Sequence, residues 1–399
     1  MSDEIIDLSG LGAGYVRDPY PFYARLRERG PVHRVLMPGG LEAWLVVGFE
    51  QARAVLADTR LSKDLGPAAE SLGIGSGPNM LIADPPNHTR LRKLVSQEFT
   101  PRRVTAMAPA VQRQTDLLLD DMLAAPEGAG DLVNGLSFPL PMTILCDLLG
   151  VPFLEREAFR NWSNVMVGTG TAEEKAAVAP ELSRYLLDLL DRKRTEPGDD
   201  LMSALIRTTD EDGDRLSRDE LLGMAWILLV VGHETTVNLI SNTVLALLEN
   251  PEQLEALRDD FGLLDGTIEE SLRYDGPVEY STFRLTVDPI EIGGTLIPGG
   301  GQLVLASLAD ANRDAARFPD PHRFDIRRGA EGGARGHLAF GHGMHYCIGA
   351  PLARLEASVA IRSLLQRCPE LRLDIPSSDI AWRPGVMRGP EALPVRWKG

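Results

Sequence analysis

The chain has 399 residues, of which 44% are hydrophobic and 25% charged, a composition that excludes a wholly disordered protein. Its formal net charge of -16 argues against nucleic acid as the main partner, because binding phosphates requires a basic surface. Three cysteines provide no disulfide framework, which is typical of a reducing compartment. The chain starts with polar and acidic residues and its apolar runs are short, so we expect a cytoplasmic protein without a membrane segment.

Helical periodicity dominates, and the Gly/Pro-rich breaks are too short to be domain linkers. We therefore predict a single domain over residues 1–399 that is mainly α with a small β portion. In chain order, helices are expected over residues 86–96, 104–124, 140–149, 155–167, 174–194, 217–249, 267–275 and 350–367. Strand-like segments occur at Val35–Leu36, Ala43–Val47, Ile290–Ile297, Leu303–Leu305 and Leu371–Ile375.

The helix over residues 217–249 has the clearest signals. Ser217 and Glu220 form a capping box at its start, and Pro251 prevents its continuation. An unbroken helix of this length measures about 50 Å. Because its middle is apolar on all sides, we expect it to cross the protein interior.

Polar residues interrupt that helix in the segment L-L-V-V-G-H-E-T-T-V, which begins at Leu228. The Thr235 hydroxyl can bond to the Val231 carbonyl, and Gly232 weakens the turn between them, so the helix can open there. Glu234 and Thr235 together offer an acid and an alcohol that can relay protons. The alternative is a buried helix with incidental polar residues.

The second informative segment reads F-G-H-G-M-H-Y-C-I-G-A-P-L-A-R-L-E from Phe340. Its glycines permit tight turns, and Cys347 lies just before a helix whose first turn contains Pro351. The positive end of that helix stabilises a thiolate, which is a good metal ligand. Two alternatives are a buried structural cysteine and a zinc site completed by nearby histidines. Zinc usually takes spaced cysteine pairs, which this segment lacks. The nearby histidines are His337, His342 and His345.

The string F-G-x-G-x-H-x-C-x-G resembles the haem-binding signature of the cytochrome P450 family. The matching residues are Phe340, Gly341, Gly343, His345, Cys347 and Gly349. The resemblance implies the cytochrome P450 fold and a haem b whose iron is ligated by Cys347. It also implies that Phe340 packs beside the cysteine and that His345 contacts a haem propionate.

The long helix extends this resemblance. The family has a small residue, Gly, any residue, an acid, Thr, and then Thr or Ser, and this chain has Gly232, Glu234, Thr235 and Thr236 in order. The resemblance implies that Val231 and Gly232 contact the haem and that Glu234 and Thr235 deliver protons for catalysis. Val231 replaces the usual small residue, so we expect a tighter pocket above the haem.

Three basic residues away from the cysteine also match the family. They are His88 and Arg92 in H-T-R-L-R, and Arg284 in T-F-R. Each one alone is most simply interpreted as a surface charge. The resemblance implies that they bind the haem propionates together with His345, because buried carboxylates need cationic partners.

An acid–arginine pair follows the long helix. Glu270 and Arg273 lie three residues apart, a spacing that on its own suggests a surface ion pair of little consequence. The family has a buried cluster in which such a pair joins an arginine from a later P-x-R-F segment. The resemblance therefore implies that Arg323 of P-H-R-F completes the cluster and holds the cysteine loop.

The implied activity is a monooxygenase that inserts one oxygen atom from dioxygen into a bulky, largely apolar small molecule. Hydroxylation or epoxidation of a natural product would fit. The resemblance implies that the pocket is lined by residues 65–83, 160–175, 226–235, 277–282 and 386–387. We expect the first of these stretches, with Glu70 as its one acid, to be a mobile glycine-rich lid. Glu279 is expected to be an exposed loop acid rather than a ligand for an amino group.

No segment resembles a flavin or nicotinamide domain, so the resemblance implies electrons from a ferredoxin and its reductase. The basic stretch Arg90–Arg103 is a candidate docking face on an acidic protein, although it could be an ordinary solvated helix face. A non-catalytic haem sensor and a peroxide-driven oxygenase are alternatives. Neither needs the acid–alcohol pair at Glu234 and Thr235.

Overall fold

The computed structural model describes residues 5–37, 40–66, 77–152, 155, 158, 161–162, 165–166, 171–208 and 215–398. The chain forms two compact units, each assembled from separate stretches of sequence. The first unit contains residues 1–62, 115–137 and 237–399, and the second contains residues 63–114 and 138–236. That residues 1–399 form a single domain stays a prediction.

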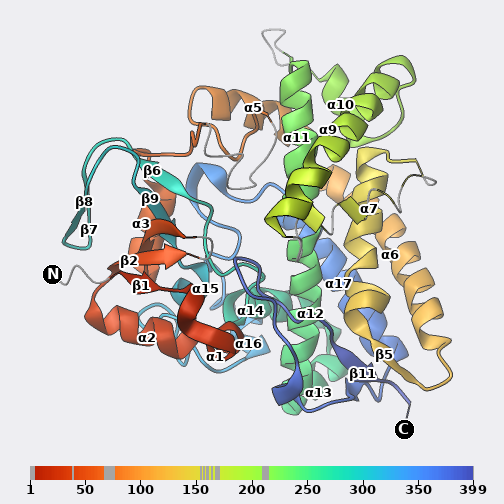
Figure 1. Ribbon diagram of the computed structural model, residues 1–399. Helices are drawn as coiled ribbons and strands as arrows, with labels where there is room; N and C mark the ends of the chain where they lie inside the picture. Colours follow the sequence, from red (N-terminus) through yellow and green to blue (C-terminus); the bar gives the residue numbers. More distant parts are fainter. Residues whose placement is uncertain are drawn as a thin grey trace. The chain divides into compact units, whose positions relative to one another are not determined.

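Within the described residues, the strands all belong to the first unit (Figure 1). Its strands are β1 (Ile6–Asp7), β2 (Val32–Met37), β3 (Leu41–Val46), β4 (Leu61–Ser62), β5 (Ala129–Asp131), β6 (Arg284–Thr286), β7 (Ile290–Ile292), β8 (Thr295–Ile297), β9 (Leu303–Ala306), β10 (Arg372–Leu373) and β11 (Pro394–Arg396). A six-stranded sheet has the order β1-β2-β3-β9-β6-β4, a three-stranded sheet the order β10-β11-β5, and β7 pairs with β8. The segment predicted as one strand over Ile290–Ile297 is therefore a hairpin, turned at Gly293 and Gly294 with φ of 55° and 80°.

Of the helices that the structure describes, most belong to the first unit. They are α1 (Gly12–Arg17), α2 (Tyr20–Arg29), α3 (Phe49–Ala57), α13 (Pro251–Asp259), α14 (Leu264–Tyr274), α15 (Leu308–Asn312), α16 (Ile326–Ala330) and α17 (Ala350–Arg367), with most of α12 (Glu234–Glu249). Short 3-10 turns occur at Ser9–Leu11, Phe261–Leu263, Gly343–His345 and Ser377–Asp379, and a π-helical turn at Val133–Ser137. The α17 helix has the bounds that the sequence predicts.

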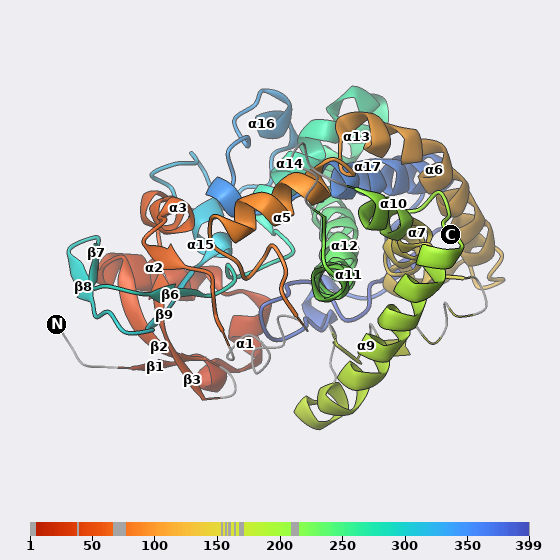
Figure 2. The ribbon, with the colours of Figure 1, turned by 90° about the horizontal axis from the view of Figure 1, so that it is seen from above.

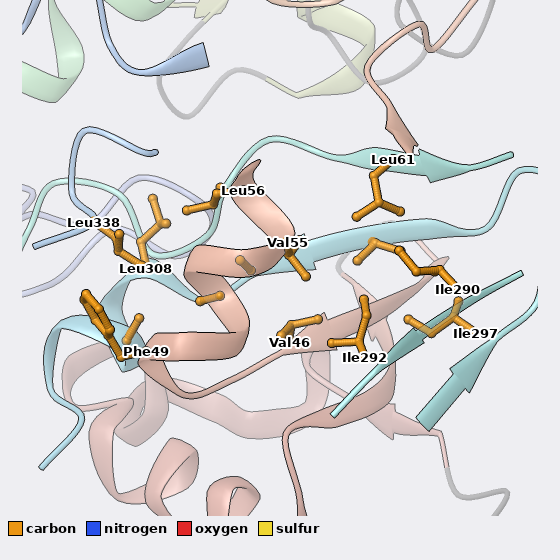
Figure 3. Packing of buried hydrophobic residues seen from close by; sticks show 14 of the residues in the cluster. Val46, Phe49, Val55, Leu56, Leu61, Ile290, Ile292, Ile297, Leu308 and Leu338 are labelled. Carbon is orange, nitrogen blue, oxygen red and sulfur yellow. The ribbon is translucent and has the colours of Figure 1, made fainter. Parts of the chain in front are cut away.

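Alternating residues of the six-stranded sheet face two different cores. Val46 and Val304 pack on one side with α3, whereas Leu45 and Leu305 pack on the other side with α2. The hairpin β7–β8 closes the first of these cores, as Figure 3 shows. This packing fixes the carboxyl end of α3 at Leu56, which matters for the cysteine loop described below.

The second unit is helical in its described residues. It contains α5 (Asn87–Ser96), α7 (Pro139–Leu149), α9 (Ala172–Thr195), α10 (Leu201–Arg207) and α11 (Arg218–Gly232), with the first half of α6 (Pro101–Leu123). The helices α7, α9, α10 and α11 pack against one another (Figure 2). The prediction of a helix over 155–167 falls partly outside the described residues, and residues 158, 161–162 and 165–166 are helical.

The close packing of α11 depends on Gly223. A Cβ atom there would lie 2.2 Å from the Pro78 carbonyl oxygen, so the helix meets residues 77–78 backbone to backbone. Residues 218–249 are long and apolar enough to cross a membrane, but 82% of their apolar window is buried. They therefore fit the core helix of a folded protein better than a membrane span.

Candidate active site

The cysteine loop of the first unit is held by its own backbone. The Cys347 amide donates a hydrogen bond to the Phe340 carbonyl at 2.9 Å. Gly341 and Gly343 both have φ of 75°, a left-handed conformation that residues with a side chain rarely adopt. The two glycines of the predicted motif thus have a structural reason, because they let the chain double back to bring Cys347 beside Phe340.

The loop lies against the end of α3. A Cβ atom at Gly343 would stand 3.1 Å from the Leu56 carbonyl oxygen, so only glycine fits without displacing α3. Arg284 is buried, and its Nη2 donates to the same Leu56 carbonyl at 3.1 Å. Two predicted haem-contacting segments, the cysteine loop and Arg284, therefore meet at one carbonyl group.

A charged cluster that the sequence analysis missed supports Phe340. The Arg354 guanidinium on α17 lies 4.5 Å from the centre of the Phe340 ring. Arg354 also donates to both oxygens of Glu269 on α14, at 2.5 and 3.0 Å, and His337 lies 3.3 Å from the same carboxylate. Burial raises the pKa of Glu269, but the hydrogen bonds from His337 and Arg354 outweigh it and lower the pKa to about 2. No spacing in the sequence indicates this pairing, because Glu269 lies 85 residues before Arg354.

The metal-donor chemistry of the loop rests on one accessible thiol. Cys347 is exposed, whereas Cys146 and Cys368 are buried, so the interpretation of Cys347 as a buried structural cysteine is wrong. Within the described ranges, no three His, Cys, Asp or Glu side chains are grouped to hold a metal ion, which contradicts the zinc alternative. A lone thiol fits a metal whose remaining ligands come from a macrocycle, and haem iron is such a metal.

In the second unit, the long helix is interrupted where the sequence predicts. The α11 helix ends at Gly232, His233 is not helical, and α12 begins at Glu234. The Thr235 hydroxyl donates to the Val231 carbonyl at 3.2 Å, as predicted. The Glu234 side chain is buried, with its carboxylate 3.8 Å from Nε2 of His233. The predicted unbroken helix over 217–249 is thus two helices joined at a polar break, although the capping box at Ser217 and Glu220 is present.

Val231 and Gly232 differ from the rest of α11. Val231 is 39% exposed and Gly232 is also exposed, whereas Leu228 and Leu229 on the preceding turn are buried. An apolar side chain left open at the end of a buried helix is the surface that a flat apolar ligand would cover.

The two remaining basic residues of the predicted site lie together on α5. His88 is buried and Arg92 is half-buried one turn further along. Burial lowers the pKa of His88, and the charge of Arg92 lowers it further. At neutral pH, Arg92 therefore supplies the charge of this pair, while a neutral His88 ring retains one N–H donor.

The buried acid–arginine pair is present, but its third member is not Arg323. The side chains of Glu270 and Arg273 are fully buried and joined by two hydrogen bonds, at 2.7 and 2.8 Å. Arg323 is exposed and contributes only its backbone carbonyl, which accepts from Arg273 at 3.2 Å. The second arginine is Arg328 on α16, whose Nε lies 3.3 Å from Glu270. The prediction for Arg323 was wrong because the motif does not determine which side chain turns inward.

The structure also corrects the expectation for Glu279. This acid is buried, and its carboxylate accepts hydrogen bonds from the hydroxyls of Tyr15 and Tyr23. It is therefore neither an exposed loop acid nor free to bind an amino group. The expected lid lies largely outside the described residues, because residues 67–76, including Glu70, are not among them.

The basic stretch Arg90–Arg103 is partly neutralised within the second unit. Arg90 forms an ion pair with Glu220, and Arg103 forms one with Glu98 at 2.6 Å. Arg102 and Lys93 are exposed. Any anionic partner would therefore meet fewer uncompensated charges than the sequence suggests.

Comparison with known proteins decides the family. A family model described as "Cytochrome P450" matches residues 172–390. The cytochrome P450 monooxygenase PikC of Streptomyces venezuelae is 55% identical over 100% of this chain and 95% of its own length. The chain is a cytochrome P450.

Other relatives agree with this assignment. The 6-deoxyerythronolide B hydroxylase of Saccharopolyspora erythraea is 45% identical over 96% of both chains. The ligand-free structure of the P450 monooxygenase TamI has a TM-score of 0.88 and 44% identity, covering 99% of this chain and 95% of that one. The mainly α fold with a small β portion is thereby confirmed as the P450 fold.

Membership of the family also confirms the cofactor and the reaction class. This P450 binds a protoporphyrin haem and is a haem-thiolate monooxygenase. The sensor alternative is dropped, since the relatives are named as monooxygenases and hydroxylases. Which of its residues hold the haem and handle protons is proposed below.

Proposed function

We propose that this P450 hydroxylates or epoxidises a bulky, largely apolar natural product, with Cys347 as the ligand of the haem iron. The observation that carries the assignment of Cys347 is its exposed thiol, on a loop fixed by two left-handed glycines directly before the amino end of α17. Unpaired N–H groups at that helix end stabilise the thiolate form. When bound, the haem supplies the oxidising chemistry, which thiolate donation to iron promotes.

The remaining haem contacts follow from charge and shape. Arg284 and His345 of the first unit, and His88 and Arg92 of the second, would hold the two propionates, because buried carboxylates need cationic or hydrogen-bonding partners. Apolar and glycine surfaces would contact the flat macrocycle. These surfaces are provided by Phe340, Gly341, Gly349, Val231 and Gly232.

Proton handling would fall to Glu234 and Thr235. The Thr235 hydroxyl uses its hydrogen in the bond to the Val231 carbonyl, so its oxygen presents lone pairs that can accept a further hydrogen bond. The Glu234 carboxyl group, buried one residue away, can give up and recover a proton. A break in the helix at His233 would let a water enter, through which such a relay would run.

The substrate class rests on the relatives. One is named 6-deoxyerythronolide B hydroxylase and another mycinamicin IV hydroxylase/epoxidase, the latter 42% identical over 94% of both chains. A solved TamI structure contains bound tirandamycin C. Those names concern other proteins. They favour a substrate of similar size and polarity here, in keeping with the scarcity of charged residues in Trp226–Thr235.

Electrons would come from a ferredoxin and its reductase in the cytoplasm. Because Arg90 and Arg103 already have acidic partners, the exposed Arg102 is the better residue with which to test docking. Reversing its charge with Arg102→Glu should slow reduction by an acidic ferredoxin and weaken the salt dependence of that rate. An unchanged rate and salt dependence would show that the partner docks elsewhere.

The ligand assignment is tested by exchanging the sulfur. Cys347→Ser should abolish the red-shifted carbon monoxide band of the reduced protein that is typical of thiolate-ligated haem. Cys368→Ala is the matched control, because Cys368 is buried and burial raises the pKa of its thiol to about 11. An intact carbon monoxide band in Cys347→Ser, or its loss in Cys368→Ala, would refute the assignment.

The proton assignment has its own measurement. Thr235→Ala should retain the carbon monoxide band but divert reducing equivalents into hydrogen peroxide rather than product. The ratio of peroxide to NAD(P)H consumed, measured with a ferredoxin system, would report this. A variant with unchanged coupling would remove Thr235 from the relay.

A further inference from the structure

A cavity of about 520 Å³ lies within the first unit, and none of its lining residues is proposed to contact the haem. Its walls come from α1–α2, the end of α12, the end of α14 and the segments near 313–322 and 377–388. Aromatic, apolar and charged side chains all line it. They include Tyr20, Ala24, Glu249, Tyr274, Arg313 and Trp382.

The unusual member is Arg313, which is only 5% exposed. Its guanidinium carbon lies 3.6 Å from the centre of the Tyr274 ring and 4.0 Å from that of Tyr20, so the group is held between two aromatic faces. Nε donates to the Tyr274 carbonyl at 2.6 Å, and Nη1 lies 3.4 Å from Nδ1 of His322. Stacking fixes the plane of the guanidinium and leaves its edge as the part that can bind a ligand.

Arg313 has no acidic partner among the described residues. The nearby Asp275 carboxylate is already used, since it accepts from Arg388 at 2.5 Å and from the Tyr20 hydroxyl at 2.8 Å. A guanidinium carries five N–H donors, and the two contacts of Arg313, which lines the cavity, use two of them. A buried charge in this condition is destabilising unless an anion compensates it.

The other walls limit which anion fits. Of the exposed acids of the lining, Asp18 lies beside the exposed Arg17, whereas Glu249 would disfavour multivalent anions such as phosphate. Apolar and aromatic walls from Pro21, Ala24 and Trp382 can cover an organic body. A carboxylate matches the edge of a guanidinium through two parallel hydrogen bonds.

We propose that this cavity binds a small organic monocarboxylate, whose two oxygens accept N–H groups of Arg313 while its body lies against the apolar wall. The site is separate from the oxidation chemistry, because no lining residue is among those proposed to bind haem or relay protons. Occupancy would connect the amino-terminal helices to the segment 377–388 through the ligand and so stabilise the folded protein.

The experiment uses the haem-loaded protein and benzoate as the probe. Benzoate should bind saturably by calorimetry and raise the thermal unfolding midpoint, whereas benzamide, a neutral molecule of similar shape, should do neither. Phosphate should bind more weakly than benzoate. The haem absorbance spectrum is followed in the same titration and should not change, which separates this cavity from binding beside the haem.

Three variants locate the site. Arg313→Gln should weaken benzoate binding by about tenfold or more, because it replaces a charged bidentate partner. Ala24→Trp fills the cavity from α2 without altering Arg313 and should abolish binding, with Ala24→Ser as its matched control. Glu249→Gln should strengthen phosphate binding by about two- to fivefold, because it removes a like charge from the exposed wall.

These outcomes decide the proposal even if Arg313→Gln fails to fold. Equal binding of benzoate and benzamide would overturn it, as would benzoate affinity unchanged by Ala24→Trp. A benzoate titration that moves the haem spectrum in step with binding would place the ligand at the haem instead.

Discussion

The Glu270–Arg273 pair offers the sharpest test of how the first unit is held together. The prediction concerns Glu270→Gln, which keeps the shape of the side chain and removes its charge. The Oε1 atom of Glu270 accepts from Arg273 at 2.7 Å, from the Asp325 amide at 3.0 Å and from Arg328 at 3.3 Å, while Oε2 accepts from Arg273 at 2.8 Å. Glutamine has only one acceptor oxygen, so its NH₂ group must take the place of the other oxygen and face an N–H donor there.

The expected cost follows from the burial of both partners. Neither side chain has any exposed surface, so Glu270→Gln leaves the Arg273 charge uncompensated except by three backbone carbonyls. Breaking a buried ion pair from one side typically costs about 3–5 kcal/mol of unfolding free energy. Arg328→Ala should cost less, about 1.5–3 kcal/mol, because it leaves the Glu270–Arg273 pair intact and removes one hydrogen bond to the carboxylate and two to the carbonyls of Pro319 and Asp320.

Arg323→Ala is the control, because the sequence motif predicts that Arg323 belongs to the buried cluster, whereas the structure has Arg328 there. Since the Arg323 side chain is exposed and only its backbone carbonyl meets Arg273, this change should cost no more than about 0.5 kcal/mol. Equilibrium urea unfolding of the haem-loaded proteins, followed by far-ultraviolet circular dichroism, gives the unfolding free energies of the three variants. The comparison requires that all the proteins have the same m-value. The reasoning fails if Arg323→Ala is as costly as Glu270→Gln, or if Glu270→Gln costs less than about 1 kcal/mol.

Three further outcomes follow from single residues. Burial raises the pKa of Glu356 from 4.5 to about 8, so between these values the folded state keeps a proton that the unfolded state releases, and stability falls as the pH rises. Glu356→Gln cannot lose this proton, so its unfolding free energy should increase relative to that of the parent between pH 5 and pH 8 in urea unfolding. A difference that stays constant with pH would contradict this. Gly223→Ala should destabilise by about 1–3 kcal/mol, despite alanine's better helix propensity, because its Cβ would lie 2.2 Å from the Pro78 carbonyl oxygen; a stabilised variant would show that α11 is free to shift. Val231→Ala should broaden the range of ligands that shift the haem spectrum and alter product ratios, because Val231 is exposed at the end of α11; unchanged spectra and products would argue against its contact with the haem.

The sequence predicted those features whose residues lie close together in one segment of the chain. The cysteine loop occupies one short segment, and the capping box at Ser217 and the opening near Gly232 are local properties of the backbone, so spacing alone predicts them. Prediction failed where a side chain meets a distant part of the chain. The buried Glu279 carboxylate accepts hydrogen bonds from the hydroxyls of Tyr15 and Tyr23, which lie more than 250 residues earlier in the sequence. The sequence around Glu279 gives no indication of these partners.

The assignment of Arg323 failed for a related reason. Its motif places an arginine near Glu270 but does not set the direction of its side chain, which depends on how α16 meets α14. That approach is made by Gly266 and Gly329, since a Cβ atom on Gly329 would lie 1.8 Å from the Gly266 carbonyl oxygen. The helices touch backbone to backbone, and this contact brings Arg328, rather than Arg323, to the buried carboxylate.

Two adjacent acids on the α14 helix therefore bind two different sets of partners. Successive residues on a helix point about 100° apart, so Glu269 and Glu270 face different neighbours. Glu270 binds Arg273 and Arg328 and fixes α16, whereas Glu269 binds Arg354, which in turn lies on the Phe340 ring beside Cys347. Because α14 packs closely on α16 through Gly266, Gly329 and the Glu270–Arg328 pair, this contact helps to position the Glu269 carboxylate against Arg354 and the cysteine loop. The buried pair at Glu270 therefore contributes to the geometry of the thiol without touching it.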